Sequence, residues 1–169
     1  MLNSRAGALL PFLLAALTAC GGGSPGGLAP EAPPGYAALP DTIVCVVDRG
    51  APVGLRQIPA KKDGDDVVVL SGGAAVRLET LHPINVIAGY AGRESWLSRA
   101  EPISFVGRGY SNVGGERRVP IELLRRVGEH RGILLYAGTE DDPPPDALYV
   151  PTAPGCIFQP FVREDLIRR

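Results

Sequence analysis

The sequence predicts an all-β domain, built either as a small barrel or as a two-sheet sandwich. Short runs of β-branched and apolar residues recur after position 41, and turn residues bound each run. The chain holds 22 glycines and 17 prolines among its 169 residues, which favours many turns over long helices. Closely spaced short strands with glycine turns are typical of barrels and sandwiches.

The strands expected in the first part of the domain are runs of β-branched or apolar residues that stop at turn residues. They cover residues 42–47, 54–58, 67–70, 75–78, 85–88 and 103–106. Residues 62–65 contain Asp-Gly, which supplies the positive backbone angles of a tight hairpin turn. Gly72 and Gly73 end the strand at 67–70, and Gly107 ends the one at 103–106.

Residues 120–136 allow two interpretations. A helix could start with Pro120 at its first position, and Gly128 and Gly132 would then end it after about two turns. The alternative is a hairpin with strands at 124–127 and 133–136 and a tip at 128–132. We favour the hairpin because the neighbouring segments are predicted to be β.

The end of the chain is also expected to be mostly β. Four acids and three consecutive prolines predict an exposed loop at residues 139–146. Strands are expected at 148–150 and 156–159, with a turn at 151–155 between them, and the last residues form one helical turn or fray. Pro160 indicates an edge strand, because proline lacks the N–H that a central strand donates. Residues 128–161 resemble bacterial SH3-like domains, in which short strands and turns close a small barrel.

The first twenty residues have the layout of a secretory signal. Arg5 precedes an apolar run at residues 8–17, which is too short to cross a membrane. Leu17-Thr18-Ala19-Cys20 follows and resembles the lipobox of bacterial lipoproteins. The resemblance implies cleavage before Cys20, diacylglycerol on its sulfur and acylation of the new amino terminus. The alternative is an ordinary secretory signal with a chance cysteine.

Three segments are therefore expected: a signal peptide at 1–19, a tether at 20–40 and one folded domain at 41–169. The tether is dominated by glycine and proline, and its only charge is Glu31, so it cannot bury enough apolar surface to fold. Several acyl chains make a stable membrane anchor. The lipoprotein resemblance and Gly21 after the cysteine imply the outer membrane of a double-membraned cell.

Two cysteines, Cys45 and Cys156, remain once Cys20 carries lipid. An even pair in an oxidising compartment predicts a disulfide, and each cysteine lies in a predicted strand at one end of the domain. The functional alternative is a reactive thiol.

No catalytic motif is complete. Residues 109–114 have one residue too many for the nucleophile elbow around Ser111. A hydrolase that uses Ser111 with His82 or His130 is the enzymatic alternative. We expect His82 in a loop before Pro83 and His130 at a water-exposed hairpin tip, so we assign no catalytic residue.

Two groups of acids could attract a cation, but both lack the spacing of a calcium loop and are interpreted as solvated turns. They are Asp63, Asp65 and Asp66, and Glu140, Asp141 and Asp142. We expect no metal and no cofactor. The formal net charge of −1 at pH 7 shows no basic excess, so no nucleic-acid partner is expected.

Four aromatic residues lie close together in the sequence: Tyr90, Trp96, Phe105 and Tyr110. Tyr90, Trp96 and Tyr110 are candidates for a surface that binds a glycan or a peptide, but we favour core packing, because a domain with so few aromatic residues needs them inside. The sequence thus predicts a lipid-anchored envelope protein that acts as a binding or structural module, with an envelope protein or a glycan as its partner.

Overall fold

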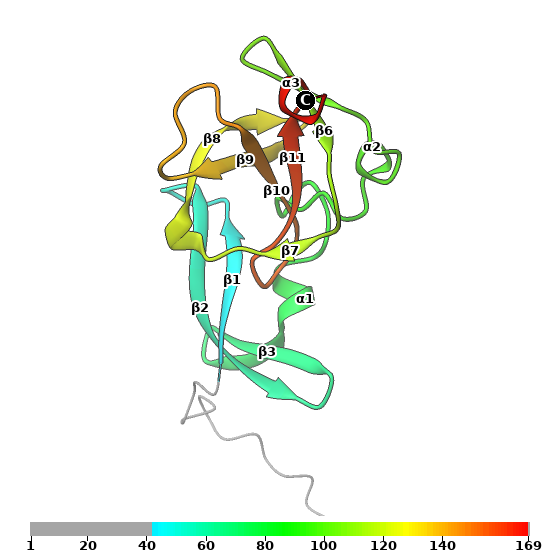
Figure 1. Cartoon of the computed structure of the whole chain (residues 1–169). Coiled ribbons are helices and arrows are strands. Elements are labelled where there is room, and N and C mark those ends of the chain that lie inside the picture. The colour runs from blue at the N-terminus through cyan, green and yellow to red at the C-terminus, as the bar shows by residue number, and fades with distance from the viewer. Residues whose placement is uncertain (1–41, 169) are drawn as a thin grey trace, which may run out of the picture. The chain divides into compact units, whose positions relative to one another are not determined.

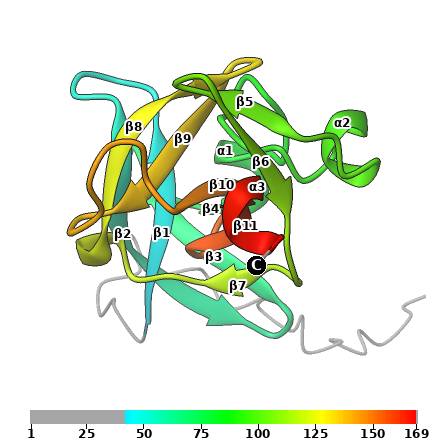
Figure 2. The ribbon, with the colours of Figure 1, turned by 45° about the horizontal axis from the view of Figure 1, so that its top comes forward.

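The computed structural model describes residues 42–168, and within that range it confirms the all-β prediction. The strands form two antiparallel sheets, one of four strands and one of seven (Figure 1). The larger sheet curls into a half-barrel, which Figure 2 shows from a second direction.

The four-stranded sheet is a meander in chain order. Its strands are β1 (Thr42–Asp48), β2 (Gly54–Asp63), β3 (Asp66–Ser71) and β4 (Ala74–Arg77). The predicted Asp-Gly turn is confirmed, because Gly64 has a φ of +63° at the tip between β2 and β3. Helix α1 (Leu78–Leu81) follows, and its buried Leu78 packs with Val44, Val46 and Val69 to form the core of this sheet.

The seven-stranded sheet is arranged in the order β5-β6-β11-β10-β9-β8, and β7 pairs with β11 beside this path. Its strands are β5 (Ile103–Phe105), β6 (Arg108–Asn112), β7 (Arg117–Arg118), β8 (Leu124–His130), β9 (Ile133–Gly138), β10 (Ala147–Ala153) and β11 (Ile157–Arg163). A Cβ on Gly128 of β8 would lie 2.6 Å from Cε2 of Phe105 in β5. The first and last strands of the sheet therefore approach each other, and Gly128 makes room for the aromatic ring between them.

The two sheets are joined through β1. The predicted disulfide is confirmed: Cys45 in β1 is bonded to Cys156 before β11, with 5.0 Å between the Cα atoms. Beside it, the Gly155 N–H donates to the Cys45 carbonyl over 2.8 Å. Further along β1, the Val47 N–H donates to the Tyr90 hydroxyl, also over 2.8 Å. These contacts hold β1 against the larger sheet from Cys45 onward.

The predicted strand at residues 85–88 is wrong, because this apolar run forms a turn. Asn85 uses its side-chain oxygen to accept from the Ala88 N–H over 2.9 Å, and its carbonyl accepts from the Tyr90 N–H. Ile87 is 87% exposed as a result. The asparagine side chain thus competes with strand pairing by bonding to nearby backbone.

The hairpin interpretation of residues 120–136 is confirmed, with two differences from the prediction. A single 3₁₀ turn, η1 (Ile121–Leu123), comes before β8. The tip is only Arg131 and Gly132, both at positive φ, so it is shorter than the predicted 128–132. Gly128 lies inside β8, next to a register shift in its pairing with β9.

The edge position predicted from Pro160 is also wrong, because β11 lies between β10 and β6. The Pro160 carbonyl accepts from Val113 N–H, so the missing Pro160 N–H faces the same side of β11. On that side Pro160 falls between the residues that pair with β7 and those that pair with β6. A central strand therefore tolerates proline at this position.

The remaining differences concern lengths and missed elements. The predicted turn at 151–155 is shorter, since β10 runs to Ala153. Strands β6 and β7 and helices α1 and α2 (Ser95–Ser98) are not predicted by the sequence, and Leu78, expected to end a strand, begins α1. The final helical turn is confirmed as α3 (Glu164–Ile167), and residues 139–146 form a loop as predicted.

The signal peptide, the tether and Cys20 lie outside the described residues, so those predictions stay predictions. Within residues 42–168, none of the helices has the length and apolar character that crossing a membrane requires.

Candidate functional site

The three candidate binding aromatics do not form a surface. Tyr90, Trp96 and Tyr110 are 1%, 2% and 0% exposed, so the candidate binding surface is wrong and the favoured core packing holds. The reason is the composition of the domain: with few aromatic side chains, the large rings fill the interior of the half-barrel and its junction with the small sheet. Each of these side chains therefore stabilises the fold and is closed to a ligand.

Trp96 shows this packing most clearly. Its ring meets the His130 imidazole edge to face at 5.0 Å and the Phe161 ring at 6.2 Å between centroids. The Arg131 guanidinium lies 5.9 Å from the centre of the indole. His130 is thus half-buried against Trp96 and is not the water-exposed tip residue that the sequence predicts.

Ser111 and the histidines are not brought together. The Ser111 hydroxyl donates to Oε1 of Glu164 over 2.9 Å, at the join between β6 and α3. His82 follows α1 beside the small sheet, and His130 packs on Trp96 in the large sheet. Within residues 42–168, no hydrogen bond joins Ser111 to either histidine, so the geometry assembles no base for a serine nucleophile.

The pKa values of His82 and His130 lie below the ordinary value of 6.5. Burial is the largest cause in both cases, and the nearby charges of Arg56 and Arg131 lower the pKa further. The unfolded chain therefore binds protons more readily than the folded domain as the pH falls below 6.5, and stability decreases with it.

We expect the domain to unfold at a lower temperature at pH 5 than at pH 7.5. The double substitution His82→Gln and His130→Gln should make this difference smaller. Glu101 and Asp165, whose pKa values are also lowered, lose their stabilising charge mainly below pH 5 and contribute little within this window. Thermal unfolding followed by circular dichroism gives the comparison, and an unchanged pH difference in the double variant would contradict it.

The acidic clusters do not converge. Asp66 pairs with Arg77 over 3.0 Å. Asp141 accepts the Gly138 N–H over 3.1 Å within its own loop. Among the described residues, no group of three or more histidine, cysteine, aspartate or glutamate side chains is arranged to hold a metal ion.

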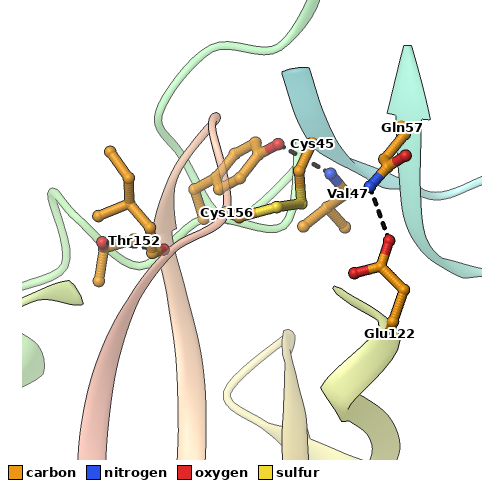
Figure 3. Close-up of a disulfide and its surroundings, with 8 residues drawn as sticks. Cys45, Val47, Gln57, Glu122, Thr152 and Cys156 are labelled. Carbon is orange, nitrogen blue, oxygen red and sulfur yellow. Dashed lines mark hydrogen bonds between the residues drawn. A yellow bond between two sulfur atoms is a disulfide. The ribbon is translucent and has the colours of Figure 1, made fainter. Parts of the chain in front are cut away.

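A groove runs beside the outer edge of β1, and we call it the β1 groove. Residues 42–45 form one wall, and the segments 118–120 and 154–156 form the other. Val67 and Leu78 lie at its floor, and the exposed Lys62 lies at the edge of that floor. Its volume is about 510 Å³. Figure 3 shows the Cys45–Cys156 disulfide with Gln57 and Glu122 beside it. The disulfide and the Gly155–Cys45 hydrogen bond close the groove where β1 meets the large sheet.

The positive charge of the β1 groove comes from Lys62 and Arg118, the charged residues among those lining it. Neither side chain forms an ion pair with another residue of the described range. Gln57, which lines the groove, donates to Oε1 of Glu122 over 2.9 Å (Figure 3). The groove therefore combines an apolar floor, a strand edge and two cations available to a ligand.

Sequence reasoning identified none of these groove residues as functional except Cys45 and Cys156, which it assigned to the disulfide. Ile43, Lys62 and Arg118 are far apart along the chain and form no motif. The only sequence signal for this site was the position of the first predicted strand, at residues 42–47, because the first strand of a meander often lies at an edge of the sheet.

No family model, curated protein or solved structure matches this chain.

Proposed function

We propose that this chain is a lipid-anchored protein of the bacterial cell envelope and that its folded domain is a binding module. The observation that carries the proposal is the disulfide between Cys45 and Cys156, because such bonds persist in oxidising compartments such as the periplasm. It supports export, which the Leu17-Thr18-Ala19-Cys20 motif also implies.

The tether determines how far from the membrane the domain can act. Residues 20–40 number 21, and a fully extended chain of that length spans at most roughly 70 Å. Gly21 after the lipidated cysteine favours the outer membrane. An anchored domain on such a tether can meet proteins or glycans of the envelope near its own membrane.

Binding has more support than catalysis. The β1 groove offers an accessible strand edge and two cations that form no ion pair with residues 42–168. By contrast, the Ser111 hydroxyl donates to Glu164, and His130 packs on Trp96. The hydrolase alternative that uses Ser111 with His82 or His130 is therefore the weaker candidate.

The anchor is tested by labelling cells with a palmitate analogue. Cys20→Ala removes the only thiol at the cleavage site, so we expect an unprocessed precursor without label. Ala19→Gly is the matched control, because the lipobox accepts alanine or glycine at that place, and it should be labelled like the wild type. Equal labelling of Cys20→Ala and wild type would refute the lipid anchor.

A further inference from the structure

The outer edge of β1 is open in its first half. Neighbouring residues of a strand point their backbone groups to opposite sides. Since the Cys45 carbonyl and the Val47 N–H both bond away from β2, the N–H and carbonyl of Ile43 also face away from β2. Within the described residues neither group of Ile43 has a hydrogen-bond partner, and Ile43 is 60% exposed.

An open strand edge is a template for another strand. The Gly155–Cys45 hydrogen bond ends the open stretch on one side, so only the part of β1 around Ile43 is available. The β1 groove lies along that part. An extended peptide placed there would receive backbone hydrogen bonds from Ile43 and would lie between β1 and the segment 118–120.

The groove presents different chemistry on the two sides of such a peptide. Pairing between strands places Val44, Lys62 and Val67 on one face of the small sheet. Leu78 packs against that face, and Val44 and Leu78 are 9% and 6% exposed. The Ile43 side chain belongs to the opposite face, because successive side chains of a strand alternate.

The charges of the groove indicate which peptide fits. Arg118 is exposed on the wall opposite β1, and Lys62 lies at the edge of the apolar floor. Both are positive and neither has an ion-pair partner in residues 42–168. Apolar side chains of the peptide would cover Val67 and Leu78, while carboxylates at the alternate positions of the peptide would reach Arg118.

We propose that the β1 groove binds an extended segment of an envelope protein in which apolar residues alternate with acidic residues, and that this segment adds as a strand to the edge of β1. This inference rests on the proposed function and names the partner class for it. A peptide recognised in this way obtains affinity from backbone hydrogen bonds and specificity from its alternating side chains.

The test uses the full mature chain in detergent micelles and a fluorescent synthetic peptide of alternating valine and glutamate. The matched peptide of alternating valine and lysine has the same length and the opposite charge. We expect binding of the glutamate peptide, weakened by added salt, and at least about tenfold weaker binding of the lysine peptide.

Ile43→Pro tests the strand edge. Proline removes the outward N–H and no hydrogen bond between β1 and β2, so we expect a folded protein that binds the glutamate peptide about tenfold more weakly. Ile43→Thr is its control, because threonine keeps the N–H and suits a strand, and it should bind within a few fold of the wild type.

Arg118→Glu tests the charge and is independent of any effect of proline on folding. We expect about tenfold weaker binding of the glutamate peptide and a gain for the lysine peptide. Arg108→Glu in β6 is an exposed control outside the groove and should leave both affinities unchanged.

Three results would overturn the proposal: equal binding of the two peptides, binding that neither Ile43→Pro nor Arg118→Glu weakens, or no binding at all. Self-association that Ile43→Pro abolishes, without peptide binding, would assign the edge to a second copy of this chain. Binding of peptidoglycan fragments in place of the peptides would assign it to a glycan. Each of these outcomes leaves the palmitate labelling of Cys20 unaffected. The proposal of peptide binding and the proposal of a lipid anchor are therefore tested independently.

Discussion

Breaking the disulfide between Cys45 and Cys156 is expected to lower the free energy of unfolding by up to about 4 to 5 kcal/mol in the loop-entropy model. The bond joins residues that are 111 positions apart, so it restricts almost the whole described domain in its unfolded state. It also joins β1 to the turn before β11, where the two sheets meet.

Urea unfolding of the oxidised protein, the reduced protein and the double variant Cys45→Ala and Cys156→Ala measures this loss. Reduced protein and double variant should agree with each other, since both lack the same covalent constraint. Unchanged unfolding midpoints in both would contradict a stabilising role, and two titratable thiols in the protein unfolded without reductant would contradict the bond itself.

Trp96→Ala is expected to destabilise the domain by about 3 to 5 kcal/mol. The indole is 2% exposed in the core of the half-barrel, and its removal leaves a cavity between α2, His130 and Phe161. Trp96→Phe keeps most of the apolar volume and should cost clearly less, which separates packing from any special role of the indole.

The same urea titration serves for Trp96, with the unfolding midpoint and slope compared among wild type, Trp96→Phe and Trp96→Ala. Trp96 does not line the β1 groove, so folded Trp96→Phe should retain peptide binding. A Trp96→Ala variant as stable as the wild type would show that this side chain is not part of the core.

Local patterns predicted the first sheet well because its strands pair in chain order. The Asp-Gly turn before Asp65 and the Gly72-Gly73 turn each connect neighbouring strands, so short-range turn chemistry determines the pairing. The same chemistry explains the failure at 85–88, where the side chain of Asn85 redirects an apolar run into a turn.

The larger sheet was harder to predict because its order departs from the sequence. Strand β6 has the sequence Arg-Gly-Tyr-Ser-Asn and little apolar content, and its place next to β11 comes from pairing over about fifty residues. The edge strand predicted from Pro160 was wrong for the same reason, because whether a strand is central depends on partners that are distant in the sequence.

The candidate site could not be predicted because it is a property of the tertiary structure. Tyr90, Trp96 and Tyr110 are close in sequence, which suits a binding surface as well as a core, and only burial decides their role. Ile43 and Arg118 look ordinary in the sequence and line one groove only because β1 lies beside the segment 118–120. The disulfide was predictable because compartment and cysteine count alone indicate it.

The measurement that tests the central claim most directly is the intact mass of the chain extracted from the membranes of its host. If the protein is a lipid-anchored envelope protein, the polypeptide begins at Cys20 and carries acyl groups on that residue. Its mass is also lower by two hydrogens than that of the reduced chain, because Cys45 and Cys156 are joined. A chain that retains residues 1–19, or one without lipid on Cys20, would contradict the account.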